Sequence, residues 1–160
     1  MISEYYRRLY KNIYGYMQSF YSELIEYAMV FISIIPGRLG IILRRKFINF
    51  RMIGKNTFIQ EWSRFYHPGN IIIGNNSGIG LRTVMNGAGG ISIGNNVVIG
   101  PEVMIWTQNH IYANPKIPIM YQGWEYKPVI IEDDVCIGAR VIILPGVKIG
   151  KGSIVGAGSV

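Results

Sequence analysis

Aliphatic residues recur at every sixth position over much of this chain, and this spacing constrains the fold more strongly than any other feature. The interval is unbroken from Ile93 to Ile105 and again from Ile131 to Val155. Two further positions of the six-residue unit are restricted, because glycine commonly follows the aliphatic residue and the fifth position is small or β-branched. The aliphatic–glycine pair occurs at Ile53-Gly54, Ile73-Gly74, Ile79-Gly80, Ile93-Gly94, Ile99-Gly100, Ile137-Gly138, Ile149-Gly150 and Val155-Gly156. A pattern of this kind is far more specific than a single glycine motif.

A longer period is superimposed on the six-residue one. The segments IGKN, IGNN, IGNN, IEDD and IGKG begin at residues 53, 73, 93, 131 and 149. Asn, Asp and Gly tolerate left-handed backbone angles, so these segments predict one recurring turn. The interval from 93 to 131 is 38 residues, whereas the last interval is 18. We therefore predict one regular coil plus an excursion near residues 110–130.

A six-residue unit with these restrictions predicts a coil of three short extended segments joined by turns. Successive coils hydrogen-bond as parallel strands about 4.8 Å apart, and their first-position aliphatic side chains stack in the interior. Each coil buries its apolar face only against its neighbours, so several coils are required. The predicted fold is an all-β solenoid, a parallel β-helix over residues 51–160, after an N-terminal helical segment over residues 1–50.

The first 50 residues carry apolar side chains at mixed spacings of three and four, which is typical of amphipathic helices. The segment IIPGRLG at residues 34–40 predicts a break, because proline and glycine end helices. Three cations, Arg44, Arg45 and Lys46, follow the break. We consider two interpretations: a helical cap whose cations are solvated, or peripheral contact of residues 24–47 with an anionic membrane or lipid-linked substrate.

The net charge of +7 is compatible with nucleic acid, anionic membranes or anionic small molecules. Nucleic-acid binding is disfavoured because the basic residues cluster near the N-terminus rather than along one face of the solenoid. The single cysteine, Cys136, excludes an internal disulfide, and we expect it to be a packing residue. Only two histidines, His67 and His110, are present. We predict no metal site, since a zinc-dependent solenoid enzyme would need three.

The segment ISIGNNVVIGPEVMIWTQNH, then a loop, then KPVIIEDDVCIGARVIILPGVKIGKGSIVGAGSV resembles the hexapeptide-repeat acyltransferases over residues 71–160. The resemblance is to the sugar O-acetyltransferases of polysaccharide and O-antigen synthesis and to the maltose and galactoside acetyltransferases. IPGRLGIILRR resembles the N-terminal segment of the polysaccharide-modifying group. The resemblance implies a left-handed β-helix, acetyl-CoA as co-substrate, a sugar or glycan acceptor, a homotrimer with active sites between chains, and a cytoplasmic location. Resembling chains continue beyond the segment that matches Val160, so we expect either a truncated chain or a shorter CoA-binding surface.

His110 lies where the repeat breaks, at the start of the expected excursion. A lone histidine is more often structural, but loops on rigid scaffolds commonly carry function, and an imidazole can remove a proton near neutral pH. The resemblance implies that His110 is a general base that activates an acceptor hydroxyl for direct attack on the acetyl thioester.

Other site residues follow from the resemblance. Asn86 matches an asparagine that contacts acceptor hydroxyls, or is a turn residue. Trp124 and Tyr126, on the excursion, would stack on a sugar or on CoA, or would pack the loop. Ala139 and Ala157 match positions whose backbone groups meet the pantetheine arm of CoA, or fill tight corners.

Three functions compete at this stage. The first is O-acetylation of a sugar hydroxyl in a surface polysaccharide or its precursor. The second is N-acetylation of an amino sugar or O-acetylation of serine on the same fold. The third is a non-catalytic β-helix scaffold, which would have no need for a long excursion with TQNH at its base.

Overall fold

The computed structural model describes residues 17, 20 and 23–160. The chain divides into two compact units, residues 1–32 and residues 33–160. Helical backbone runs over residues 23–34, and the exposed apolar side chains there include Leu24, Tyr27 and Phe31. The helix expected over residues 1–16, 18–19 and 21–22 lies outside the described residues. Within the described part of the chain, no helix has both the length and the apolar character needed to cross a bilayer.

The predicted break at Pro36 and Gly37 is confirmed. Helical backbone ends at Ile34, and a second helix, α2 (Gly37–Phe47), begins after an extended Pro36, whose ring removes a backbone donor. Helix α2 packs against strand β2 (Phe58–Ile59) of the first coil. The helix approaches the preceding segment so closely that a Cβ at Gly40 would overlap the carbonyl oxygen of Ile35.

Arg44 corrects the sequence interpretation of the basic cluster. Its side chain is fully buried between α2 and the first coil, so it is neither solvated nor free to contact a membrane. Its Nε donates to the carbonyl of Ile59 at 2.8 Å, and its Nη1 donates to the carbonyl of Ile35 at 2.7 Å. Burial lowers the pKa of this guanidinium, and the nearby charge of Glu61 opposes that shift. The arginine therefore joins the helix to the solenoid.

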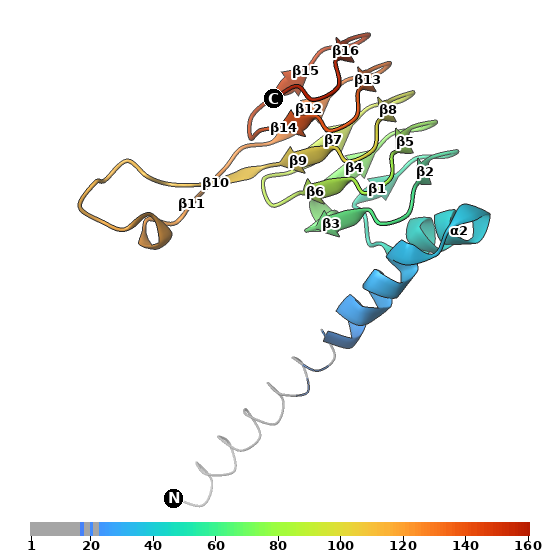
Figure 1. The fold of residues 1–160 in the computed structure, drawn as a ribbon, viewed down its shortest axis with the longest axis horizontal. Helices are drawn as coiled ribbons and strands as arrows, with labels where there is room; N and C mark the ends of the chain where they lie inside the picture. Colours follow the sequence, from blue (N-terminus) through green and yellow to red (C-terminus); the bar gives the residue numbers. More distant parts are fainter. Residues whose placement is uncertain (1–16, 18–19, 21–22) are drawn as a thin grey trace, which may run out of the picture. The chain divides into compact units, whose positions relative to one another are not determined.

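Residues from Met52 onward form a three-sided parallel β-solenoid of about five coils, which confirms the predicted fold (Figure 1). Sheet A contains β1 (Met52–Ile53), β4 (Ile71–Ile73), β7 (Ile91–Ile93), β12 (Val129–Ile131) and β15 (Lys148–Ile149). Sheet B contains β2 (Phe58–Ile59), β5 (Gly78–Ile79), β8 (Val98–Ile99), β13 (Cys136–Ile137) and β16 (Ile154–Val155). Sheet C contains β3 (Arg64–Tyr66), β6 (Val84–Asn86), β9 (Met104–Trp106) and β14 (Ile142–Ile143). Two short 3₁₀ helices, η1 (Pro68–Asn70) and η2 (Ile119–Tyr121), lie in the connections.

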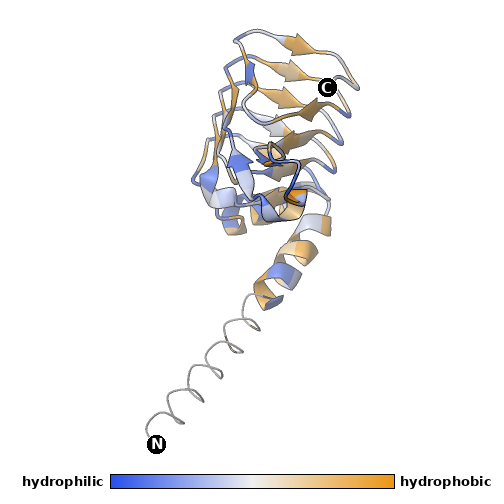
Figure 2. Ribbon diagram, turned by 90° about the vertical axis from the view of Figure 1, so that its left-hand side faces the viewer, coloured by the Kyte–Doolittle hydropathy of each residue, from blue (hydrophilic) through white to orange (hydrophobic). Residues whose placement is uncertain are grey.

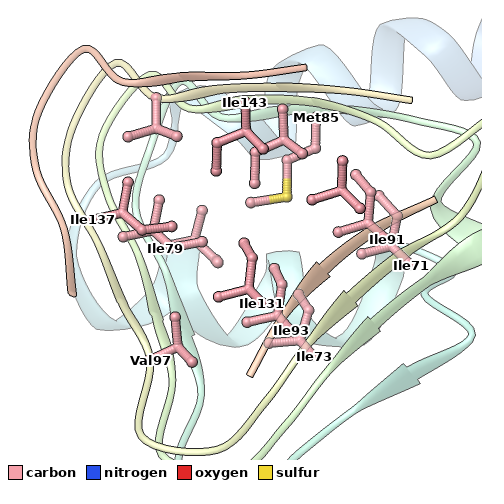
Figure 3. Close-up of a cluster of buried hydrophobic side chains, with 14 of the residues drawn as sticks. Ile71, Ile73, Ile79, Met85, Ile91, Ile93, Val97, Ile131, Ile137 and Ile143 are labelled. Atoms are coloured by element: carbon pink, nitrogen blue, oxygen red, sulfur yellow. The ribbon is translucent and has the colours of Figure 1, made fainter. Parts of the chain in front are cut away.

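The register of the sheets explains the six-residue spacing. Each first-position residue lies directly over its counterpart in the next coil, as in Ile73 over Ile53 and Ile93 over Ile73. Their side chains point into the prism and form one apolar core (Figure 3). The same stacking appears as superposed hydrophobic strands in Figure 2. Cys136 precedes such a position and faces outward, so our expectation that it packs in the core is wrong.

The recurring turn predicted from Asn, Asp and Gly is confirmed at the corner between sheets A and B. Asn56, Asn76, Asn96 and Asp134 all have φ between 55° and 61°. The residues one position earlier form a ladder in which side-chain oxygens accept backbone N–H groups from the neighbouring coil. At the top of the ladder, hydrogen bonds from Asn95 hold the pKa of Asp133 below its usual value. These turns keep successive coils in register.

The chain leaves the coils after Thr107 and returns at Val129. Strands β10 (Gln108–His110) and β11 (Trp124–Tyr126) form an antiparallel hairpin stalk that carries a loop well away from the solenoid (Figure 1). Val129 pairs with Ile91, so the coils on either side of the excursion stack directly. The insertion therefore leaves the repeat undisturbed.

Candidate functional site

The site is built at the base of the hairpin, at the corner between sheets C and A. His110 lies opposite Trp124, and Gln108 lies opposite Tyr126. Because side chains alternate along a strand and directly opposed residues share a face, these four side chains lie on one face of the hairpin. The register thus brings His110 together with two of the predicted substrate-binding residues, Trp124 and Tyr126.

The imidazole of His110 packs against the indole of Trp124. The ring centroids are 3.6 Å apart, and the planes are inclined by 33°. Nδ1 of His110 is enclosed and accepts or donates no hydrogen bond within the described part of the chain. The backbone N–H of the same residue donates to Oδ1 of Asn109 at 3.0 Å. The indole of Trp124 thus covers one face of the imidazole, and no ion pair joins the ring to a carboxylate in the described part of the chain.

Asn86 is the last residue of β6 and leads into the turn below the root of the hairpin, which we call the turn of Asn86. It is only 4% exposed, and its Oδ1 accepts the backbone N–H of Ala88 at 3.0 Å. The backbone carbonyl of Asn86 accepts a hydrogen bond of 2.6 Å from the hydroxyl of Thr107. Residues at the same position of adjacent coils are Tyr66 and Trp106, whose rings meet edge to face at 6.3 Å. The side chain of Asn86 is thus largely enclosed and held within its own turn.

Ala139 and Ala157 lie at another corner, between sheets B and C. Strands β13 and β16 pair in register, which places the two alanines one above the other in successive coils. A Cβ at Gly138 would lie 2.5 Å from the backbone N of Ala157, so the backbones are closely packed here. Sheet C lies between this corner and the root of the hairpin. The single chain therefore groups the predicted residues into two clusters: one around His110, one around the alanines.

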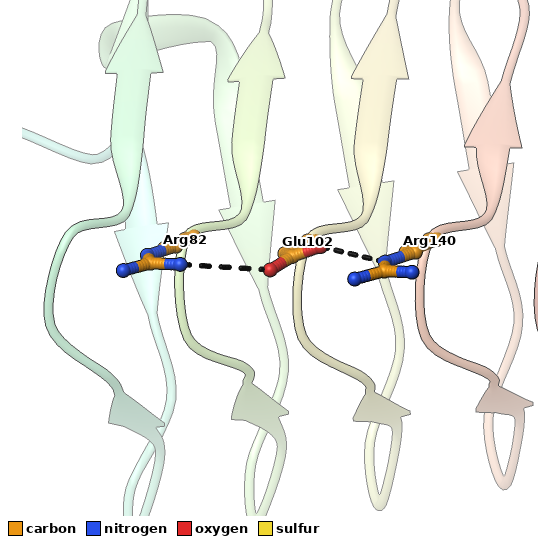
Figure 4. A network of polar contacts seen from close by, with 3 residues as sticks. All are labelled: Arg82, Glu102 and Arg140. Atoms are coloured by element: carbon orange, nitrogen blue, oxygen red, sulfur yellow. Dashed lines mark hydrogen bonds and ion pairs between the residues drawn. The ribbon is translucent and has the colours of Figure 1, made fainter.

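The cations near the alanines are engaged by surface carboxylates. Glu102 accepts Nε of Arg140 at 2.8 Å and lies 3.7 Å from Nη1 of Arg82 (Figure 4). The hydrogen bond from Arg140 lowers the pKa of Glu102, and Glu102 raises the pKa of Arg140. Lys148 and Glu132, 2.7 Å apart, form a separate ion pair on the side of sheet A. The single carboxylate of Glu102 therefore offsets only part of the positive charge of Arg82 and Arg140 at this corner.

Neither of two open concavities in the described part of the chain has His110 in its lining. One, of about 470 Å³, is formed by the excursion loop between Tyr112 and Gln122. The other, of about 460 Å³, lies along the outer face of sheet A. Among the described residues, no group of three His, Cys, Asp or Glu side chains could hold a metal ion.

Sequence reasoning missed one residue of this cluster, Thr107. Its hydroxyl also accepts the backbone N–H of Gly89 at 2.7 Å, so it joins the turn of Asn86 to the hairpin. The only sequence signal for Thr107 was that it is a small polar residue close to a predicted turn. Such residues are common near turns, so this signal did not distinguish it.

The fold and its six-residue repeat define the chain as a hexapeptide-repeat solenoid protein. Comparisons with known proteins show which family of such proteins it belongs to. Residues 128–160 match the model "Bacterial transferase hexapeptide (six repeats)", and residues 70–104 match "Hexapeptide repeat of succinyl-transferase". A galactoside O-acetyltransferase of Lactococcus lactis is 39% identical over 113 residues, which is 69% of this chain and 53% of the relative. This chain belongs to the hexapeptide-repeat acyltransferase family, and within it is similar to the galactoside and maltose O-acetyltransferases.

Solved structures that are similar to this one include two acyltransferases. A maltose O-acetyltransferase from Clostridium difficile has a TM-score of 0.71 and 26% identity, over 85% of this chain and 72% of that one. A variant of an N-acyltransferase from Bacillus cereus, in complex with dTDP-4-amino-4,6-dideoxyglucose and coenzyme A, has a TM-score of 0.58 and 29% identity, over 72% of this chain and 74% of that one. The chain spans about half the length, or less, of the first curated relatives that it matches.

Proposed function

We propose that this protein is an acetyl-CoA-dependent O-acetyltransferase that acts on a sugar hydroxyl of a surface polysaccharide or its precursor. The observation that carries the proposal is His110, stacked on Trp124 in a hairpin whose root is hydrogen-bonded to Asn86 through Thr107. Membership of the acyltransferase family and the similarity to a galactoside O-acetyltransferase support the reaction class. A scaffold alone would not account for an imidazole stacked on an indole in the long excursion from the repeat.

In this proposal His110 acts as general base. The imidazole takes the proton of the acceptor hydroxyl while the oxygen forms a bond to the thioester carbonyl carbon. The resulting tetrahedral oxyanion breaks the carbon–sulfur bond, and the imidazolium returns its proton to the CoA thiolate. The products are the sugar ester and CoA thiol. General-base assistance contributes about 10²–10⁴-fold in rate.

The acceptor would lie between the imidazole and the turn of Asn86, with Trp124 and Tyr126 as surfaces for a sugar ring. The pantetheine arm would run past the corner formed by Ala139 and Ala157, where small side chains leave backbone groups accessible. Coenzyme A is bound by the similar N-acyltransferase from Bacillus cereus.

We also propose that the two clusters are brought together by a homotrimer, in which the alanine corner of one chain faces the His110 cluster of another. The excursion loop exposes large apolar side chains that a neighbouring chain would cover, among them Tyr112, Met120 and Tyr121. Sedimentation equilibrium should give a trimer for the wild type and a smaller species for Met120→Glu. Lys116→Glu, on the same loop, is the matched control and should remain trimeric.

N-acylation of an amino sugar is the second candidate. It is favoured by the similarity to the N-acyltransferase that binds dTDP-4-amino-4,6-dideoxyglucose. A panel of neutral sugars, amino sugars and serine, assayed under one set of conditions, separates the two reactions. Turnover confined to amino acceptors would replace the O-acetyl proposal.

Peripheral contact with an anionic membrane through residues 24–47 is part of the same proposal. Helix α2 has no acidic residue, and Leu39 and Ile42 remain about 60% exposed between the cations Arg38 and Lys46. Co-sedimentation with phosphatidylglycerol vesicles, but not with phosphatidylcholine vesicles, is expected. Loss of binding in Ile42→Glu would locate the contact on α2, and equal sedimentation with both vesicle types would exclude it.

The central test is CoA thiol release from acetyl-CoA with the acceptor panel. His110→Asn should lower kcat by about 10²-fold or more, because the general base is removed. His67→Asn is the matched control: it is exposed, has a left-handed backbone that asparagine tolerates, and should retain full activity. Equal kcat for the two variants would remove His110 as the base, and absence of turnover in the wild type with every acceptor would favour the scaffold.

A further inference from the structure

Thr107 is the last residue of the coil before the chain leaves for the hairpin, and its side chain is fully buried. The hydroxyl donates to the carbonyl of Asn86 at 2.6 Å and accepts the backbone N–H of Gly89 at 2.7 Å. Its own carbonyl accepts the backbone N–H of Lys127, the residue directly after the returning strand β11, at 3.0 Å. One residue thus connects the turn of Asn86 to both strands of the hairpin.

The packing around this residue leaves little freedom. A Cβ at Gly89 would lie 2.5 Å from the carbonyl oxygen of Thr107 and 3.0 Å from the backbone N of Lys127. The close approach therefore requires glycine at position 89, and the two backbone segments are in direct contact. Any shift of the hairpin root must move the turn of Asn86, or break the hydrogen bonds of the Thr107 hydroxyl.

His110 lies three residues beyond Thr107, which corresponds to about 10 Å of extended chain. With a lever of that length, a tilt of only about 6° at the root moves the imidazole by about 1 Å, and a displacement of that size can cost about 10²-fold in rate. We propose that Thr107 is a positioning residue, whose hydroxyl sets the separation between the acceptor-side turn and the His110 imidazole. This inference rests on the proposed acyl transfer.

A buried hydroxyl with the same bonding pattern provides a matched control. Ser77 is also fully buried, donates to the carbonyl of Gly94 at 2.8 Å and accepts the backbone N–H of Val97 at 3.1 Å. It lies at the corner between sheets A and B, away from the hairpin. If a bridging hydroxyl acts only through the stability of the coils, Thr107→Val and Ser77→Ala should have the same consequences.

The experiment compares Thr107→Val, Thr107→Ser and Ser77→Ala in the full chain. Thr107→Val should lower kcat by about 10²-fold, with a smaller change in KM for acetyl-CoA, while Thr107→Ser returns kcat to within a few-fold of wild type. Peptide-level hydrogen exchange supplies a readout that does not depend on turnover. Exchange in residues 108–126 should increase in Thr107→Val and stay at the wild-type level in Ser77→Ala.

The two proposals fail in different ways. Wild-type kcat in Thr107→Val, or hairpin exchange no faster than in Ser77→Ala, would overturn the positioning role even if His110→Asn is inactive. Absence of turnover in the wild type would overturn the proposed function, and the exchange measurement would then decide alone whether Thr107 positions the hairpin.

Discussion

Replacement of Arg44 by methionine offers a quantitative test of how α2 is joined to the solenoid. Methionine replaces the aliphatic part of the arginine side chain but supplies no donors. The carbonyls of Ile59 and Ile35, which accept hydrogen bonds at 2.8 and 2.7 Å, would remain in place without a donor. These carbonyls belong to the backbone, so no second substitution can replace them.

The magnitude follows from these two contacts. A hydrogen bond to a charged group contributes about 1.5–3 kcal/mol, and a buried carbonyl left without a donor costs about 1–3 kcal/mol. We therefore expect Arg44→Met, which removes two such hydrogen bonds, to lower the free energy of unfolding by about 3–5 kcal/mol, a large part of the 5–15 kcal/mol typical of a domain. For a chain of this size that corresponds to a fall in Tm of roughly 10 °C.

Urea unfolding followed by far-UV circular dichroism measures the effect. Lys46→Met is the control, because Lys46 lies on the same helix with an exposed side chain and its loss should cost under about 0.5 kcal/mol. If Arg44→Met and Lys46→Met unfold within 0.5 kcal/mol of each other, roughly the scatter of surface substitutions, the buried guanidinium does not stabilise the junction and our account of α2 is incorrect.

Three further predictions concern the coils and the site. Gly74→Ala should destabilise the protein by about 3 kcal/mol or more, because its Cβ would overlap the backbone of the next coil, whereas Gly69→Ala meets nothing within 4 Å and should be neutral in the same urea titration. The pKa of Asp133 is lowered in the folded state, so its carboxylate contributes stability above its unfolded pKa, and this stability is lost as the pH falls through the folded pKa. Asp133→Asn should therefore flatten the acid side of a plot of urea midpoint against pH. An unchanged slope below about pH 4 would contradict the hydrogen-bond ladder. Trp124→Leu should lower kcat about tenfold by freeing the His110 ring, with an unchanged Tm, and a variant with normal kcat would show that the ring stack is not needed.

The coils could be predicted from sequence because the residues that recur at every sixth position are the same residues that stack in the core. Each first-position isoleucine, such as Ile93, is buried by its counterparts six residues and one coil away, so the spacing directly encodes the fold. The position of Arg44 could not be predicted, because it is one of three adjacent cations and only the fold of α2 under the first coil distinguishes them. That arrangement depends on Gly40, whose packing becomes apparent only in three dimensions.

The candidate site divides in the same way. The interruption of the repeat indicated His110 and the excursion, since a break in a strict period is visible in one dimension. The stack on Trp124 depends on the register of the hairpin, and the register of two strands separated by 13 residues of loop has no sequence signal here. Thr107 was missed because its importance comes from hydrogen bonds to a turn 18 to 21 residues earlier.

The direct stacking of Ile93 and Ile131, across the whole length of the excursion, has a consequence for how such a protein can diversify. The coils on either side of the insertion pack against each other in the same way, whatever sequence the insertion has. Doubling the length of a flexible loop costs only about 0.6 kcal/mol in closure entropy. Segments that recognise different acceptors could therefore be exchanged at this position, by recombination or by design, while the prism that carries them is inherited unchanged.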